Sequence, residues 1–357
     1  MPVKRRMSKK QGPVGALARI GLFFYIRSAF LYPYRFGVIM SQNISCTNRP
    51  RIGGQAIMEG VMMNGEHHYS VAVRKPNGTI QSELFDSHSL TNKGGFFAWP
   101  LVRGVIRFVE SLIIGIKTLD YSADLYIEEE ESEPKKEPKT GLGKWWNEHA
   151  DQFLTTISML LAVVIAVGLF LMAPMFISKL LYKYVFTSEH HYLMGLIEGL
   201  IRMGLFLLYI FLVSRIKDIA RVFQYHGAEH KTINTFEDGV PLTVENVRER
   251  SRYNKRCGTS FLFIVMFISI LVFSFIQITE ILPRLLAHLA LIPLIGGLSY
   301  ELLRFSAKTD SKFIGALVQP GLWIQHITTN EPDDEQIAVA IESVHKLMET
   351  EHPEFLS

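Results

Sequence analysis

Residues 155–177 read TTISMLLAVVIAVGLFLMAPMFI and decide the fold class, because they hold no charged residue over a length that can cross a bilayer. A helix needs roughly 20 apolar residues to span the hydrocarbon core. Three further apolar runs follow along the chain, at residues 193–213, 261–278 and 285–303. The sequence therefore predicts a mainly α, polytopic membrane protein with about four transmembrane helices.

Two of these runs contain charged residues. Glu198 and Arg202 lie four residues apart in the outer half of the second run. Each charge needs a partner in lipid, so we expect a structural ion pair there. The fourth run contains His288, which we interpret as a polar anchor, and Glu301, which lies near its other end.

Positive charges predict the orientation of the spans. The connection between the second and third runs is rich in lysine and arginine, whereas the other two connections hold only Lys179, Lys183 and Arg284. Cytoplasmic loops carry the excess of these residues. The long connection is therefore predicted to be cytoplasmic, and four spans place both termini on the same side of the cell (plasma) membrane.

Charge and cysteine content restrict the expected partners. The net charge is +3 and 48% of the residues are hydrophobic, with basic residues clustered beside the apolar runs. This arrangement favours anionic lipid headgroups over nucleic acid. Cys46 and Cys257 both fall on the predicted cytoplasmic side, where thiols stay reduced, so no disulfide is predicted. A homo-oligomer or a membrane protein partner stays open.

The soluble parts divide into four segments around a membrane domain at residues 151–306, whose cytoplasmic loop covers residues 215–260. Residues 1–50 form a basic extension that is interpreted as disordered, interfacial, a transit segment or translation assigned too far upstream. Residues 51–127 are predicted to form a β-hairpin, because Pro76-Asn77-Gly78 separates two alternating stretches, and an amphipathic helix. Residues 128–150 are a charged linker, and residues 307–357 form a cytoplasmic amphipathic helix.

The candidate metal-binding motif is Tyr225-His226-Gly227-Ala228-Glu229-His230-Lys231. On a helix, His226 and His230 share one face, with Cβ atoms roughly 5 to 6 Å apart. The order His-x-x-Glu-His is that of the inverted zincins, in which two histidines bind zinc and the glutamate activates water. We therefore predict a divalent metal site, with zinc as the ion and Glu229 as the general base.

The two histidines continue an apolar stripe that descends from the second run. Ile216, Ile219 and Phe223 precede His226 and His230 at helical steps, which predicts that the second helix runs on through the motif. The rings should then be at least partly buried, and burial favours the neutral imidazole that binds metal. The alternative is a pair of core histidines bonded to backbone or headgroups.

A zinc site needs a third protein ligand. Glu301 is the first choice, because it lies at the cytoplasmic end of the fourth run and at the expected depth of the histidines. Carboxylates within a membrane are functional hypotheses by default, although Arg304 could be its structural partner. The other candidates are Glu59, Glu237, Asp238 and Glu245.

Three further features have structural alternatives. Cys257 could act as a nucleophile with a histidine, but a lone cysteine beside a span is usually inert. The glycine-rich residues 53–63 lack the pattern of a phosphate loop, so we expect close backbone packing. The arginines within residues 243–256 either mark the cytoplasmic side or cradle an anionic group.

Several separated blocks resemble one family, the YqhQ-like bacterial membrane proteins, whose function is unknown and which are often labelled predicted metal-dependent enzymes. The resemblance covers residues 51–348 and rests on blocks at residues 53–63, 103–105, 225–231, 256–260, 299–301 and 331–334. It implies a multi-pass membrane protein and supports a metal at His226 and His230. Residues 1–40 depart from the family pattern.

The prediction for function is a metal-dependent, hydrolytic enzyme at the cytoplasmic membrane surface. Its metal ligands are His226, His230 and Glu301, and its base is Glu229. The alternative is a non-enzymatic scaffold, assembly factor or transporter component in which the same cluster is structural.

Overall fold

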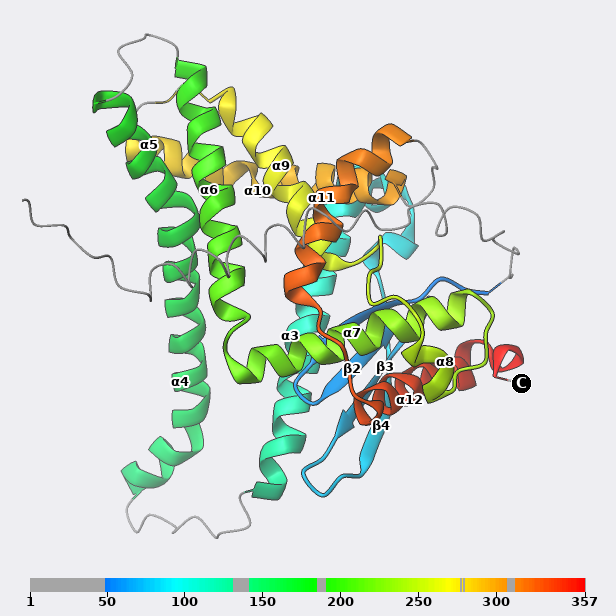
Figure 1. The fold of residues 1–357 in the computed structure, drawn as a ribbon. Helices are drawn as coiled ribbons and strands as arrows, with labels where there is room; N and C mark the ends of the chain where they lie inside the picture. The colour runs from blue at the N-terminus through cyan, green and yellow to red at the C-terminus, as the bar shows by residue number, and fades with distance from the viewer. Residues whose placement is uncertain are drawn as a thin grey trace, which may run out of the picture. The chain divides into compact units, whose positions relative to one another are not determined.

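The computed structural model describes residues 49–130, 141–184, 191–276, 278, 280–306 and 312–356. The interpretations of the basic N-terminal extension and of Cys46 lie outside these residues. The described part is mainly helical, with one antiparallel sheet of four strands (Figure 1). The predicted class, a mainly α chain with a small β element, is confirmed.

Three helical segments in the described part are long and apolar enough to cross a membrane: Thr156–Tyr184, Met194–Val213 and Ile281–Ser306. They correspond to three of the four predicted spans. On the first, Leu160, Val164 and Ile165 are 62%, 66% and 58% exposed, which is typical of a surface that faces lipid. The expectation of a membrane protein agrees with this apolar surface.

These segments belong to the longer helices labelled in Figure 1. They are α4 (Gly141–Val167), the π-helical turn η3 (Gly168–Met172), α5 (Ala173–Tyr184), α6 (His191–Val213) and α10 (Ile281–Ser306). The charged linker predicted at residues 128–150 is thus shorter than expected, because α4 begins inside it and the preceding helix ends at Glu130.

The third predicted span is apolar but shorter than expected. It forms α9 (Gly258–Ser274), with 17 residues, and packs against α6, α10 and α11 (Lys312–Thr328). Helix α11 was not predicted, because it contains Pro320. Proline lacks the amide donor and disfavours helix interiors.

The sheet contains the predicted hairpin and two others. Its strands are β1 (Gly53–Ile57), β2 (Gly60–Asn64), β3 (His68–Arg74) and β4 (Ile80–Asp86), paired in chain order. The β3–β4 turn holds Gly78 at φ 85°, so the prediction from Asn77-Gly78 is confirmed. The β1–β2 turn was not predicted, because it places Glu59 rather than a glycine at positive φ, 48°.

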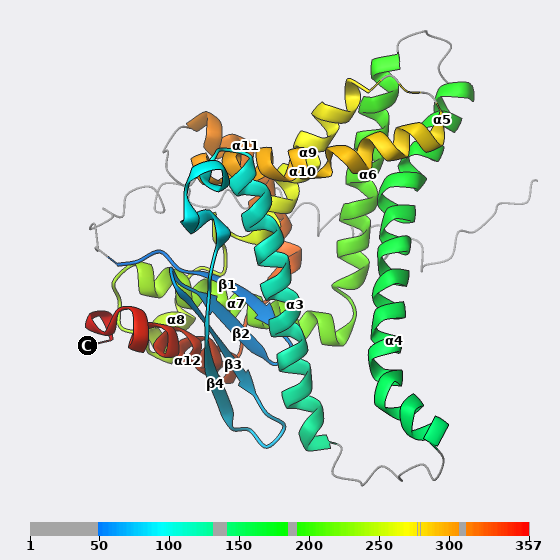
Figure 2. The ribbon, with the colours of Figure 1, turned by 180° about the vertical axis from the view of Figure 1, so that it is seen from behind.

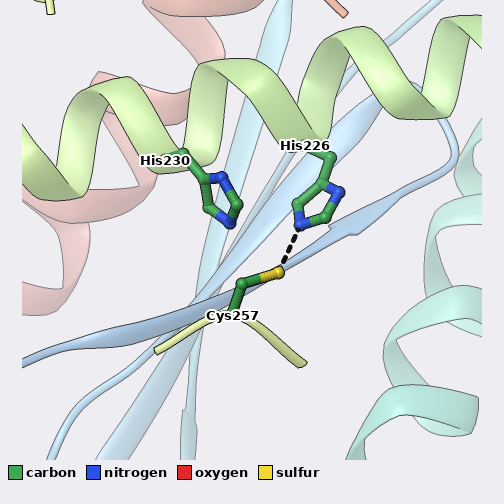
Figure 3. A group of neighbouring side chains, drawn as sticks. All are labelled: His226, His230 and Cys257. Carbon is green, nitrogen blue, oxygen red and sulfur yellow. Dashed lines mark hydrogen bonds between the residues drawn. The ribbon is translucent and has the colours of Figure 1, made fainter. Parts of the chain in front are cut away.

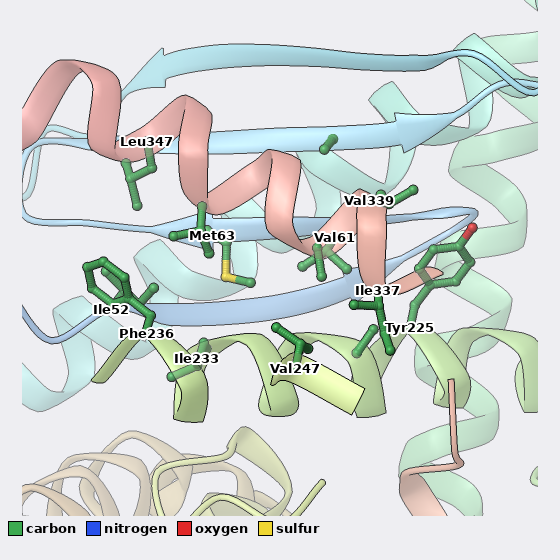
Figure 4. Packing of buried hydrophobic residues seen from close by; sticks show 14 of the residues in the cluster. Ile52, Val61, Met63, Tyr225, Ile233, Phe236, Val247, Ile337, Val339 and Leu347 are labelled. Carbon is green, nitrogen blue, oxygen red and sulfur yellow. The ribbon is translucent and has the colours of Figure 1, made fainter. Parts of the chain in front are cut away.

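Helices cover both faces of this sheet. One face packs against α7 (Lys217–Glu237) and α12 (Asp334–Glu351), and α3 (Val102–Glu130) lies on the other face (Figures 1 and 2). Side chains alternate along a strand. Val61 and Met63 join the core under α7 and α12 (Figure 4), whereas Met62 packs in the cluster that includes Leu125 of α3. The β element is therefore the middle layer of a small domain.

The C-terminal helix is fixed at both ends. Asp333 caps its start and exchanges hydrogen bonds with Gln336 in a capping box. At its other end the Glu351 carboxylate accepts backbone N–H groups of Glu66, His67 and His68 at 3.0, 2.7 and 2.6 Å. Burial alone would raise the pKa of Glu351, but these bonds outweigh it and hold the pKa below its ordinary value.

The expected ion pair between Glu198 and Arg202 is present at 2.7 Å. It is part of a larger buried network, because Arg284 and His288 of α10 lie 2.5 and 3.6 Å from the same carboxylate. His288 is thus a partner of the charges on α6 rather than an isolated polar anchor. The network joins α6 and α10 where an unpaired charge would be costly.

Candidate metal centre

The motif lies on a helix of its own. α6 ends at Val213, and α7 begins at Lys217 with Ile216 as its N-terminal cap residue. The predicted continuous helix is therefore wrong, and Ile216, 52% exposed, does not share the packed stripe. α7 instead leaves α6 through a turn and lies across the sheet (Figure 1).

His226 and His230 face the same direction from α7 (Figure 3). Their ring centroids are 4.4 Å apart. His226 Nδ1 lies 2.8 Å from the carbonyl oxygen of Thr328, and His230 Nδ1 lies 2.6 Å from that of Arg252. Because a carbonyl only accepts, each Nδ1 carries the proton and each Nε2 keeps a lone pair. The predicted burial is confirmed, since His230 is 1% exposed.

Cys257 completes the group from a different element. It caps the start of α9, and its buried thiol is free. Its Sγ lies 3.1 Å from His226 Nε2 (Figure 3). Ligand atoms of His226, His230 and Cys257 all lie within 4.8 Å of one another.

This donor set fits a divalent ion such as zinc. Nε2 of His230 is buried and has no hydrogen-bond partner among the described residues. Its lone pair is therefore available to bind a metal ion. Zinc–nitrogen and zinc–sulfur bonds of about 2.0 and 2.3 Å place tetrahedral ligands about 3.3 to 3.5 Å apart. Small side-chain movements would bring the three atoms to those separations.

Glu229 stands beside the group as the sequence predicts. Its carboxylate oxygen Oε2 lies 3.8 Å from Nε2 of His226, and the residue is 4% exposed. Burial raises the pKa of Glu229 to about 7, while a protonated His226 would lower it. Gly54 of β1 makes room for this side chain, because a Cβ there would lie 2.6 Å from Glu229 Cγ.

The structure places Glu301 outside the group. Both of its oxygens accept from Arg103 of α3, at 2.7 and 2.6 Å. Its hydrogen-bond partner is therefore Arg103 rather than a histidine of the motif, and the expected Arg304 acts on it through its charge alone. The position of Glu301 along its helix did not reveal this contact, because Arg103 belongs to a helix that is distant in sequence.

The other candidate carboxylates are also engaged with arginine or lie apart. Glu59 binds Arg221 and accepts from Tyr225 at 3.1 Å. Glu237 binds Arg256 and Asp238 binds Arg250, while Glu245 is exposed on the short helix α8 (Val244–Arg248).

Sequence reasoning considered Cys257 beside the histidines only as a nucleophile and missed it as a possible metal ligand. One usable signal was its position in Arg256-Cys257-Gly258-Thr259-Ser260, directly before an apolar helix on the same side as the motif.

Three of the arginines within residues 243–256, which could have bound an anionic group, are instead paired with carboxylates. Arg248 binds Asp334 at 2.8 and 2.5 Å, and Arg250 and Arg256 bind the acidic end of α7.

Fold and site together define a membrane-associated helical protein in which a histidine–cysteine group lies beside a helix-covered sheet. Residues 99–350 match the model of a protein family of unknown function, DUF1385. The chain belongs to this family. It is also 35% identical over 307 residues to the uncharacterized protein YqhQ of Bacillus subtilis (strain 168), covering 85% of this chain and 93% of that protein. No solved structure matches the chain.

Proposed function

We propose that this chain is a metal-dependent hydrolase that works at the cytoplasmic surface of a membrane. The observation that carries the proposal is that one ligand atom each of His226, His230 and Cys257 lies within 4.8 Å of the others, with each histidine Nδ1 already bound to a carbonyl. Two imidazoles and one thiolate suit zinc, and catalytic zinc sites have three protein ligands.

The residues of the site divide the chemistry between them. His226, His230 and Cys257 would hold the ion, which when bound lowers the pKa of water and polarises an acyl or phosphoryl oxygen. Glu229 takes the proton from the attacking water at Oε2, the oxygen that faces His226. The same carboxyl then returns the proton to the leaving group.

The cytoplasmic placement rests on charge. Arg215, Arg221, Arg248 and Arg252 lie between the apolar segments α6 and α9, on the same connection as the motif. An excess of arginine and lysine marks cytoplasmic connections. Apolar helices on one side and the soluble domain on the other would give the site access to a substrate held at the bilayer surface.

Cobalt(II) tests the ligand set on the purified full-length chain in detergent. Thiolate ligation gives a sulfur-to-cobalt charge-transfer band in the near ultraviolet. We expect the band in wild type and in Cys46→Ser, and its loss in Cys257→Ser. Glu229→Gln should keep the band, since this residue is a base and not a ligand. The absence of the band from wild type would refute the proposed ligand set.

The competing function is a scaffold or assembly factor whose histidines only hold α7 in place. The 3.1 Å contact between His226 and Cys257 and the two carbonyl contacts favour this alternative, because they also tie α7 to α9 and α11. It predicts that His230→Ala lowers the thermal midpoint while cobalt has no effect on any variant.

A further inference from the structure

A polar cavity is lined by residues that lie far along the chain from the histidines. Its volume is about 320 Å³, and it opens between α3, α10 and two short 3₁₀ helices, η1 (Leu90–Lys93) and η2 (Gly95–Ala98). Its lining residues are Thr91, Ala98, Arg103, Arg107, Tyr300 and Arg304. Three guanidinium groups and two hydroxyls therefore surround one space.

The arginines are only partly neutralised. Arg103 uses Nε and Nη2 for Glu301, which leaves Nη1. Arg304 has no hydrogen bond or ion pair with any residue that the structure describes. Arg107 makes one long bond, of 3.3 Å, to Asn92 Oδ1. The cavity thus has more positive charge than its own carboxylate can balance.

Glu110 adds little to that balance. It lies 4.0 Å from Arg107, at the outer limit of an ion pair. Its oxygens already accept from the Ser89 hydroxyl at 2.7 Å and the Leu90 amide at 2.8 Å. Guanidinium forks match phosphate oxygens well, and such pairs are stronger than neutral hydrogen bonds. An anion with several oxygens is the complementary occupant.

The aromatic residues around the cavity indicate its depth in the bilayer. Phe96, Phe97 and Trp99 are 59%, 40% and 61% exposed. Exposed aromatic side chains of this kind concentrate where the hydrocarbon meets the headgroups. Arg304 stands near the end of α10, itself long and apolar enough to span. Both observations place the cavity at headgroup level.

An apolar stripe on α3 leads away from the arginines. Its members are each between 46% and 50% exposed: Val109, Leu112, Ile113, Ile116 and Leu119. At 1.5 Å per residue the stripe is about 15 Å long. Ile114 and Tyr121 of the same helix pack on the sheet, so the exposed stripe is a second apolar face of α3.

We propose that this cavity binds the phosphate of an anionic phospholipid, whose acyl chains lie along the α3 stripe. Arg107 and Arg304 supply guanidinium donors that make at most one hydrogen bond to the described residues, and Arg103 supplies Nη1 while Glu301 holds it in place. The hydroxyls of Thr91 and Tyr300 can donate to further phosphate oxygens. This lipid site is separate from the histidine–cysteine group and does not depend on it.

Fluorescence quenching of Trp99 tests the site in the full-length chain. The other tryptophans, Trp145, Trp146 and Trp323, are replaced by phenylalanine, and the protein is placed in nanodiscs of brominated phosphatidylglycerol or brominated phosphatidylcholine. We expect stronger quenching and tighter association with phosphatidylglycerol. The preference should fall about fivefold for each arginine removed in Arg107→Gln and Arg304→Gln.

Matched variants separate the site from general charge and from folding. Arg215→Gln removes an exposed arginine just after the end of α6 and should keep the full preference. Arg107→Lys/Arg304→Lys should keep most of it. Equal quenching by both lipids, or a preference that survives Arg107→Gln/Arg304→Gln, would overturn the proposal. Relief of quenching by inorganic phosphate at the lipid's own concentration would also overturn it, by making the cavity a site for free phosphate.

Discussion

Replacing Gly54 by alanine tests how closely the sheet packs on the candidate site. Gly54 lies on β1, and a Cβ there would lie 2.6 Å from both Cγ and Oε1 of Glu229. Its neighbour Gly53 has nothing within 4 Å of the same added atom. The two substitutions are chemically identical and adjacent on one strand, so Gly53→Ala is a matched control.

The magnitude follows from the difference between the two variants. Replacing glycine inside a strand gains roughly 0.5 to 1 kcal/mol of backbone entropy, and this gain is common to both. Only Gly54→Ala forces the buried Glu229 side chain to move, and overpacking a core costs about 1 to 3 kcal/mol. Gly54→Ala should therefore be less stable than Gly53→Ala by about 1 to 3 kcal/mol, or roughly 2 to 12 °C in the thermal midpoint.

Thermal unfolding of the purified full-length variants in one detergent gives the comparison. A second measurement uses Glu229→Ala, which removes the crowded Cγ. In that background the difference between Gly54→Ala and Gly53→Ala should shrink to within about 0.5 kcal/mol. Equal midpoints for the two glycine variants, or an undiminished difference in the Glu229→Ala background, would refute the packing of β1 against the site.

Three further predictions concern charged groups away from the histidines. Glu351→Gln should destabilise the protein by about 1 to 2 kcal/mol at neutral pH. Since the pKa of Glu351 is lowered by folding, its contribution is complete above about pH 4.5 and is lost as the pH falls through the lower value, so the two unfolding curves should converge in acid. Glu198→Gln should cost roughly 3 to 5 kcal/mol, because Arg202 and Arg284 would be left buried without their carboxylate; an unchanged midpoint would count against this network. Glu301→Gln should lower the midpoint by about 1 kcal/mol through the loss of its arginine partner, and should leave metal content as in wild type, which a ligand role would not allow.

The parts of the fold that sequence reasoning captured depend on local patterns. An uncharged apolar run and an Asn-Gly turn each leave their signal within one short stretch of sequence. His226 and His230 were paired in the same way, because four residues of helix bring them together whatever surrounds them. Their burial also followed, since they lie on the apolar side of α7.

The missing parts depend on contacts between distant segments. Cys257 meets His226 only because α9 begins beside α7, and nothing within either segment encodes that approach. Glu301 was placed by depth alone, but Arg103 of α3 lies closer to it than the motif does. The turn at Glu59 was not predicted, because a residue other than glycine adopts positive φ there. Helix α11 was not predicted, because Pro320 interrupts its helical pattern.

Elemental analysis of the purified protein tests the central claim most directly. Wild type from metal-replete cells should carry close to one zinc or other divalent ion per chain. His226→Ala, His230→Ala and Cys257→Ser should each lose the ion, while Glu301→Gln retains it. A metal-free wild type, or histidine and cysteine variants that keep the full metal content, would contradict the account.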